Sequence, residues 1–306
     1  MARNRPDHAG CRRRILRRRF VTIRLSAAGE GIYLRGGPDA VLLIHGLTGT
    51  PTEMRFVARR LNADGFTVWV PRLRGHCRSE AELVRTGWRD WYDGVEEALV
   101  RLHASARRVF VGGLSMGALL SLRLALKCRH LVSGTALYST TLFYDGWSIP
   151  RLRFLLPLIL KSPFARRYRF VEAYPFGIKD ARLRDIIVTR MSRGDSAAAG
   201  FSATPGASLI ELRQLIARVK RDLPLITTPT LIVHARDDDM TSPRNADYVA
   251  RRLSGPVRQI LLDDCYHMIT IDQQREEVAQ QTAAFFRSLP LPPIAGRPIF
   301  DQPRGA

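Results

Sequence analysis

From about residue 38 onward, short runs of consecutive apolar residues alternate with longer stretches in which apolar residues recur at three- and four-residue spacing. The apolar runs predict buried strands at residues 40–44, 66–70, 108–111, 131–138, 230–234 and 257–262. The periodic stretches predict helices at residues 52–62, 88–104, 116–127, 243–253 and 273–287. Strands that alternate with helices predict an α/β fold, with a mostly parallel central sheet flanked by helices.

Residues 140–222 interrupt this alternation. They contain several prolines and only short helical stretches, at 152–160 and 208–219. We therefore expect a helical insertion at 140–222 that covers the sheet, between core segments 36–139 and 223–288. Outside the core, we expect a disordered basic extension at 1–35 and an irregular proline-rich tail at 289–306.

Composition excludes a disordered or fibrous chain, since 45% of the 306 residues are hydrophobic and 25% are charged. The formal net charge is +20, and only four of the 48 basic residues are lysine. Residues 1–24 hold nine arginines and one aspartate, an arm that could attract nucleic acid or anionic lipid. Because no aromatic interleaving or nucleic-acid-binding motif accompanies the arm, we expect no nucleic-acid partner.

Neither an export signal nor a membrane span is expected. The apolar stretch at 20–23 is too short for a signal peptide, and the run at 154–160 is too short to cross a bilayer. The four cysteines (Cys11, Cys77, Cys128 and Cys265) are too far apart for a metal-binding pair or a disulfide framework. The sequence therefore predicts a soluble, cytoplasmic protein with free thiols and without a metal site.

Residues 113–117 read Gly-Leu-Ser-Met-Gly and match the motif G-x-S-x-G, directly after a predicted strand and at the start of a predicted helix. A serine on such a tight turn needs glycine on both flanks, because the backbone segments around it press together. The turn would present the Ser115 hydroxyl to a cleft, beside the positive end of the helix dipole. This context makes Ser115 the candidate nucleophile.

A serine nucleophile needs a base and an acid that orients it. Asp237, Asp238 and Asp239 follow the strand at 230–234, and His267 follows the strand at 257–262. Taken alone, the aspartates could be a turn or helix cap, and His267 could be an exposed loop histidine. Placement of serine, aspartate and histidine after successive strands, in that order, favours a catalytic triad.

The reaction also needs two N–H donors for the developing oxyanion. The N–H of Met116, the residue after the nucleophile, is one candidate. The N–H of Leu47, in the His-Gly-Leu-Thr-Gly loop at 45–49, is the other. His45 is expected to shape this loop rather than to exchange protons.

The chain resembles small bacterial carboxylesterases and monoacylglycerol lipases of the α/β-hydrolase superfamily. The resemblance rests on LLIHGLTGTPTEM (42–54), PRLRGH (71–76), LVRTGWRDWYDGV (83–95), VGGLSMGALLSLRLA (111–125), LIVHARDDDM (231–240) and YHMITID (266–272). It implies an α/β-hydrolase fold with a small helical cap, and ester hydrolysis without a cofactor. It also implies Ser115, Asp238 and His267 as the triad, with Leu47 and Met116 as oxyanion donors.

The resemblance also selects among the three aspartates. In the related esterases the pattern A-R-x-D places the acid three residues after Ala235, which is Asp238, and its offset to Pro243 agrees. Asp239 stays an alternative, since many such hydrolases have the acid four residues before that proline. We expect the acid to be buried and its two neighbours to be more exposed.

The sequence thus predicts a serine hydrolase that acts through an acyl-enzyme on short- to medium-chain acyl esters or monoacylglycerols. An acyltransferase, thioesterase or peptidase could use the same triad, because all of them form an acyl-enzyme. A hydrolase-fold interaction module without activity is a further alternative, which the intact triad disfavours. The apolar side chains of residues 142–160 are expected in part to line an acyl pocket over Ser115.

Overall fold

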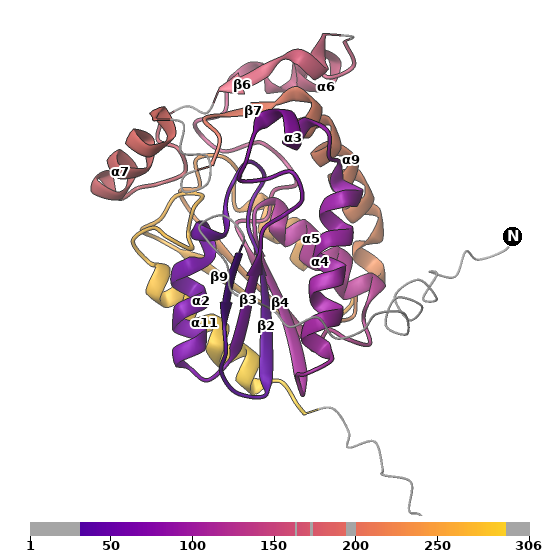
Figure 1. Cartoon of the computed structure of the whole chain (residues 1–306). Helices are drawn as coiled ribbons and strands as arrows, with labels where there is room; N and C mark the ends of the chain where they lie inside the picture. The colour runs from indigo at the N-terminus through magenta and orange to yellow at the C-terminus, as the bar shows by residue number, and fades with distance from the viewer. Residues whose placement is uncertain (1–30, 163, 172–173, 194–199, 292–306) are drawn as a thin grey trace, which may run out of the picture.

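The computed structural model describes residues 31–162, 164–171, 174–193 and 200–291, and its centre is a single large sheet (Figure 1). The strands of this sheet lie in the order β1-β3-β2-β4-β5-β8-β9, and every neighbouring pair is parallel except β1 with β3. Their bounds are β1 (Gly31–Leu34), β2 (Asp39–Ile44), β3 (Thr67–Pro71), β4 (Arg108–Leu114), β5 (Gly134–Tyr138), β8 (Thr230–Ala235) and β9 (Val257–Leu262). The predicted α/β fold with a mostly parallel sheet is confirmed.

Helices cover both faces of the sheet, as the continuous apolar runs of the strands require. Successive residues of β2 point to opposite faces, so Val41 packs with one hydrophobic cluster and Leu42 with the other. Helices α2 and α11 pack on the Val41 face, and α4, α5, α9 and α10 pack on the Leu42 face. The helices of the core are η1 (Pro51–Met54), α2 (Arg55–Ala63), α3 (Glu80–Val84), α4 (Trp88–His103), α5 (Met116–Lys127), α10 (Arg244–Ala250) and α11 (Arg275–Ser288).

The structure adds one strand to the predicted central sheet and moves the ends of several others. Residues 31–34 were assigned to the N-terminal extension, but they form β1, an edge strand antiparallel to β3. Its side chains are half-buried, so it lacks the continuous apolar run that marks the central strands. The strand expected at 131–138 begins only at Gly134, because Leu131 donates its N–H to Cys128 in the turn after α5.

The segment between β5 and β8 carries its own elements, and those that precede α9 (Gly206–Asp222) lie over the carboxyl ends of the core strands (Figure 1). They are η2 (Arg151–Leu155), α6 (Leu156–Ile159), η3 (Ala165–Arg167), β6 (Arg169–Val171), α7 (Ala181–Ser192), β7 (Ala203–Pro205), α9 (Gly206–Asp222) and η4 (Leu223–Leu225). The pairing of β6 with β7 and the helix α7 were not foreseen. Helix α9 packs against the core rather than above it, since Leu212 and Leu215 join the cluster around α4 and α5.

The ends of the chain lie mostly outside the described residues. Residues 1–30 of the predicted basic extension and residues 292–306 of the predicted proline-rich tail are outside the described part of the chain. Within the described part of the chain, no helix is both long enough and apolar enough to cross a bilayer.

Candidate active site

β4 ends in a sharp turn that carries Ser115 to the start of α5. Ser115 has φ of 56° and ψ of −113°, a positive-φ conformation that costs a non-glycine residue about 1–3 kcal/mol. A Cβ on Gly113 would lie 2.2 Å from the carbonyl carbon of Gly117, and a Cβ on Gly117 would lie 2.1 Å from the Ile44 oxygen. The predicted steric need for glycine at both flanks is therefore confirmed.

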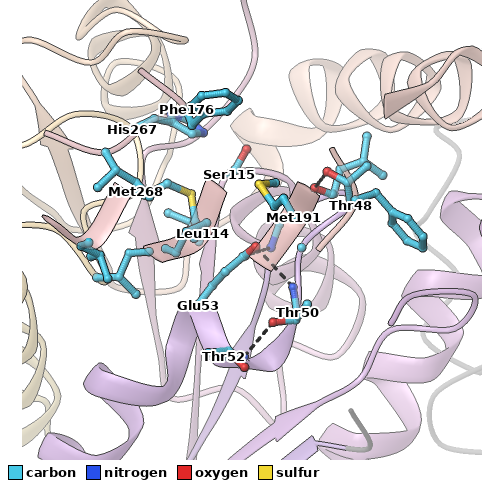
Figure 2. A pocket seen from close by; sticks show the side chains of 18 of the residues that line it. Thr48, Thr50, Thr52, Glu53, Leu114, Ser115, Phe176, Met191, His267 and Met268 are labelled. Atoms are coloured by element: carbon cyan, nitrogen blue, oxygen red, sulfur yellow. Dashed lines mark hydrogen bonds between the residues drawn. The ribbon is translucent and has the colours of Figure 1, made fainter. Parts of the chain in front are cut away.

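Ser115 lines a cavity of about 200 Å³ at the carboxyl ends of the strands. Figure 2 shows that His267, Met268 and Glu53 surround the same space. Leu47, in the loop after β2, also lies on the wall. The structure thus brings the candidate nucleophile, the candidate base and one candidate oxyanion residue to one cavity.

His267 and Asp238 form a buried hydrogen-bonded pair. Nδ1 of His267 lies 2.9 Å from Oδ2 of Asp238 and 3.0 Å from Oδ1. Because β8 and β9 are parallel neighbours, the loops that follow them meet at the same edge of the sheet. With Nδ1–H donated to the carboxylate, the neutral ring leaves Nε2 free to accept a proton.

The carboxylate of Asp238 is held in its ionised form. Its Oδ1 accepts hydrogen bonds from the N–H of Met240 at 2.9 Å and of Thr241 at 2.8 Å, and its Oδ2 accepts from Thr241 Oγ1 at 3.1 Å. Burial alone would raise the pKa of Asp238, but His267, His234 and the Thr241 N–H outweigh burial and lower it. Asp238 is therefore a negative charge beside the imidazole.

The pKa of His267 shifts the other way. Burial alone would lower this pKa, but the Asp238 carboxylate, with Asp239 and Glu53 as further negative groups, raises it above its usual value. Nearby, His234 donates from Nε2 to the carbonyl of Thr241 at 2.7 Å, and burial lowers the pKa of His234. Protonation in this cluster is thus directed to His267.

The hydroxyl of Ser115 rests against Thr141, with 2.8 Å between Ser115 Oγ and Thr141 Oγ1. Among the described residues, no hydrogen bond joins Ser115 to His267. In ligand-free hydrolases the serine–histidine hydrogen bond is often long and tightens only with substrate present. Thr141, in the loop after β5, had no motif in the sequence to single it out.

The expected exposure of the two other aspartates is right for Asp237 and wrong for Asp239. Asp237 is exposed, and its carboxylate lies 3.9 Å from Lys179 Nζ. Asp239 is only 1% exposed, and its carboxylate accepts hydrogen bonds from the N–H of His267 at 3.2 Å and of Gly177 at 3.1 Å. It turns inward because the tight loop after β8 directs both neighbouring carboxylates toward the loop that carries His267.

The loop after β2, which carries the candidate oxyanion residue Leu47, is fixed by His45. This side chain is fully buried, and its Nε2 accepts a hydrogen bond from the N–H of Leu73 at 3.2 Å, so its Nδ1–H donates to the carbonyl of Gly46 at 2.9 Å. Burial and the neighbouring His76 lower the pKa of His45 to about 3. His45 therefore stays neutral and anchors the loop, as the sequence predicts.

The two candidate oxyanion donors lie at the expected places, in the loop after β2 and at the first position of α5. None of the hydrogen bonds between described residues uses the N–H of Leu47 or of Met116. The N–H of Gly46, the residue before Leu47, donates a hydrogen bond to Oε2 of Glu53 at 3.0 Å. Sequence reasoning missed Glu53, although T-P-T-E at 50–53 is a capping-box pattern, and the structure has that box.

The cavity wall opposite Ser115 comes from α7 and its neighbours. None of the described side chains of residues 142–160 lines this cavity, so the expected pocket segment is wrong. Large apolar side chains of that segment are instead exposed, including Leu152 at 64% and Phe154 at 69%. Among the described residues, the apolar lining residues that follow residue 174 in the inserted segment are Phe176, Ile178, Leu183, Ile186, Ile187, Met191 and Phe201. The apolar lining residues of the core are Leu47, Leu114, Met240, Met268 and Ile271.

No group of three or more His, Cys, Asp or Glu side chains within the described ranges is arranged to hold a metal ion. The described cysteines, Cys77, Cys128 and Cys265, are buried, and none of them forms a disulfide with another described residue. Cys265 accepts a hydrogen bond from the N–H of Gln274 at 3.2 Å and packs among apolar side chains, as the sequence predicts.

Residues 38–274 match the profile of the family described as "Serine aminopeptidase, S33". The chain is 31% identical over 261 residues to a thermostable monoacylglycerol lipase of Bacillus sp. (strain H-257), a match that spans 85% of this chain and 95% of that protein. It is 28% identical over 262 residues to a carboxylesterase of Bacillus subtilis (strain 168), which spans 83% of this chain and 95% of that protein.

Solved structures share the fold. A metagenome-derived lipolytic enzyme, from a study of LipS and LipT, superposes with a TM-score of 0.73 at 24% identity, over 86% of this chain and 99% of its own. The monoacylglycerol lipase of Paleococcus ferrophilus superposes with a TM-score of 0.68 at 18% identity, over 83% of this chain and 96% of its own. These likenesses confirm the α/β-hydrolase fold.

Proposed function

The chain belongs to the serine aminopeptidase S33 family of α/β-hydrolases, and we propose that it hydrolyses carboxylic esters through an acyl-enzyme. The substrates we propose are short- to medium-chain acyl esters or monoacylglycerols. The observation that carries the proposal is the buried His267–Asp238 pair on the wall of an apolar cavity that also contains Ser115. The lipase and carboxylesterase relatives support the ester bond as the target.

In the proposed first step, Ser115 Oγ attacks the ester carbonyl carbon while His267 Nε2 takes the hydroxyl proton. The electron pair of the carbonyl moves onto its oxygen, which the N–H groups of Leu47 and Met116 would bind. Collapse of this intermediate breaks the bond to the alcohol, and His267 returns the proton to the leaving oxygen. Asp238 keeps the proton-accepting tautomer and stabilises the imidazolium that forms.

The second half repeats these steps with water. His267 takes a proton from water, the resulting hydroxide attacks the acyl carbon, and the carboxylic acid leaves as Ser115 regains its proton. Before the first half, the Ser115 hydroxyl has to turn from Thr141 toward His267. The 2.8 Å contact with Thr141 is thus the resting position of the nucleophile.

The alcohol and acyl preferences would be set by the segment above the core, which we propose acts as a cap. Apart from Arg190, its lining residues from α7 are apolar and suit an acyl chain. Glu53, the carboxylate on this wall, already accepts hydrogen bonds from Gly46 and Thr50. This lining favours an acyl ester over the charged amino terminus of a peptide.

The experiment is a substrate series on the purified chain. We expect turnover of p-nitrophenyl esters and monoacylglycerols, and labelling of Ser115 by a fluorophosphonate probe that a Ser115→Ala control does not take up. Amino-acid p-nitroanilides, acyl thioesters and added alcohol acceptors test the peptidase, thioesterase and acyltransferase alternatives. Faster turnover of any of these than of every oxygen ester would overturn the proposal, as would an unlabelled, inactive wild-type protein.

We further propose a cytoplasmic location, which is supported by the buried thiols of Cys77, Cys128 and Cys265, since none of the three forms a disulfide with another described residue. Fractionation of cells that express the full-length chain tests it. Recovery of the esterase activity outside the cytoplasmic fraction would contradict this location and leave the catalytic proposal untouched.

A further inference from the structure

A second cavity, of about 460 Å³, lies away from Ser115 and shares no lining residue with its pocket. Its walls are the loop after β5, the first residue of α6, one face of α9 and the start of α10. The lining residues of α9 follow helical spacing: Arg213, Ile216, Ala217 and Lys220. This size is within the roughly 300–1,000 Å³ of small-molecule pockets.

Cationic side chains gather around the aromatic wall of this cavity. Lys220 Nζ lies 3.5 Å from the ring centre of Phe143, and the guanidinium carbon of Arg244 lies 5.0 Å from the same ring. Arg252 lies over the adjacent ring of Tyr248 at 3.8 Å. Arg213 adds a further cation to the lining.

Within the part of the chain that the structure describes, these cations form no ion pair with a carboxylate. Among the described residues, no ion pair involves Lys220, Arg213 or Arg244, and Asp145 is the one carboxylate that lines the cavity. Asp145 already accepts hydrogen bonds from the N–H and the hydroxyl of Ser242, each at 2.9 Å. Burial, with Arg244 and Arg252 nearby, lowers the pKa of Lys220 to about 8, although Asp145 acts in the opposite direction.

Buried hydrogen bonds hold the loop that forms one wall of this cavity. Asn245 is fully buried, and its Oδ1 accepts hydrogen bonds from the N–H of Leu142 at 2.8 Å and of Phe143 at 2.7 Å. Its Nδ2 donates to Asp145 Oδ1 at 2.9 Å. The loop therefore keeps its shape without a ligand, with apolar Leu142, Leu156 and Ile216 beside the cations.

We propose that this cavity binds an anionic amphiphile, a carboxylate with an apolar chain. The cations would bind the carboxylate, and the apolar lining would cover the first part of the chain. The choice of carboxylate rests on the proposed function, because hydrolysis of an acyl ester releases such a molecule. The cavity would then hold a product of the reaction at a place distinct from Ser115.

Direct binding tests the proposal without catalysis. The chain has only four lysines (Lys127, Lys161, Lys179 and Lys220), so ¹³C reductive methylation gives four lysine NMR signals beside that of the N-terminal amine, and single Lys→Arg variants assign the four. Decanoate, below its critical micelle concentration, should shift the Lys220 signal to saturation and raise the pKa of its amine. Lys127 and Lys161 serve as internal controls and should not move, whereas Lys179 follows Ile178 of the Ser115 cavity and reports on binding there.

Variants separate the cavity from non-specific attraction. Arg244→Gln removes one cation and Ala217→Met fills the apolar part, and both residues are exposed, so the fold should persist. Each should weaken the decanoate affinity about tenfold or more, which corresponds to about 1.4 kcal/mol. Arg251→Gln, which removes an exposed charge outside the lining, should leave the affinity unchanged.

Three outcomes would overturn the proposal: no decanoate-dependent shift of Lys220, an equal shift with inorganic phosphate at the same concentration and ionic strength, or full binding in both cavity variants. A phosphate response would indicate a simple anion site. None of these results bears on ester turnover, which is measured separately, so failure here and failure of the proposed function are distinguishable.

Discussion

The carboxylate of Asp239 accepts a hydrogen bond from the backbone N–H of His267 at 3.2 Å, while its other oxygen accepts the N–H of Gly177 at 3.1 Å. One side chain therefore ties the loop that carries the candidate base to the segment above the cavity. Asp238, the preceding residue, makes its contact with the imidazole instead. The carboxylate of Asp238 thus binds the imidazole of His267, and the carboxylate of Asp239 binds its backbone N–H.

This division predicts a graded series of Asp→Asn variants. Asp238→Asn should reduce kcat for p-nitrophenyl hexanoate roughly 10⁴-fold, because the amide no longer selects the productive tautomer of His267. Asp237→Asn should change kcat less than about tenfold, since its carboxylate is exposed. Asp239→Asn should lie between, because an amide offers one acceptor where two N–H donors need partners. A larger loss at Asp239 than at Asp238 would assign the acid to Asp239.

The acid limb of the pH–rate profile should lie above the ordinary histidine pKa of about 6.5. Below its pKa, His267 is protonated and cannot accept the proton of Ser115, so kcat/KM falls as pH decreases through that pKa. The carboxylate of Asp238 raises the pKa of His267, which moves the limb to higher pH. Neutralising the acid in Asp238→Asn should move the limb back down.

Profiles of kcat/KM from pH 5 to 9 measure this, with circular dichroism at each pH as the control for folding. A wild-type limb below pH 6 in a folded protein would exclude His267 as the base.

Ser115→Ala should abolish ester hydrolysis and leave the fold intact, because the acyl-enzyme route is lost. Thr141→Val removes the resting partner of the Ser115 hydroxyl while keeping the size of the side chain. Since the hydroxyl then has His267 as its remaining partner, kcat should stay within about tenfold of wild type. Thermal melts check both variants, and more than trace turnover by pure Ser115→Ala protein would contradict the assignment.

Acyl-chain preference should depend on α7 and not on residues 142–160. Each buried CH₂ contributes up to about 0.8 kcal/mol, so kcat/KM should rise from acetate to longer esters until the cavity is full. Ile187→Phe should shorten the preferred chain, because Ile187 lines the cavity. Leu152→Ala is the matched control outside the lining. Equal rates for acetate and hexanoate esters would refute the proposal that the cavity binds the acyl chain. A shifted chain-length preference in Leu152→Ala would show that residues 142–160 contribute to the acyl pocket.

A stability prediction concerns the ion pair that joins α5, the helix after the nucleophile, to α9. Arg123 and Asp222 form it, with side chains 6% and 8% exposed. Asp222→Ala should lower the free energy of unfolding by about 3–5 kcal/mol, because a buried guanidinium loses its partner. Arg221→Ala, an exposed neighbour of the same carboxylate, should change it by less than about 0.5 kcal/mol. Urea denaturation measures both, and equal effects would contradict this ranking.

Much of the fold followed from short-range patterns. Continuous apolar runs marked the central strands, and the glycines around Ser115 marked the turn, because both depend on residues close together in the chain. The strand β1 escaped this reasoning, since an edge strand with half-buried side chains has no distinctive periodicity. Helix α7 escaped as well, because none of its described side chains is fully buried.

The sequence by itself determined that Ser115, His267 and an aspartate of 237–239 follow parallel strands, and parallel strands bring their carboxyl ends to one edge of the sheet. Only the tertiary structure decided that Asp238 contacts the imidazole, that Asp239 is buried, that Thr141 holds the Ser115 hydroxyl, and that α7 rather than 142–160 lines the cavity. Beyond a strand end the direction of a side chain no longer alternates. It is set by packing against segments far away in the chain, which no local pattern encodes.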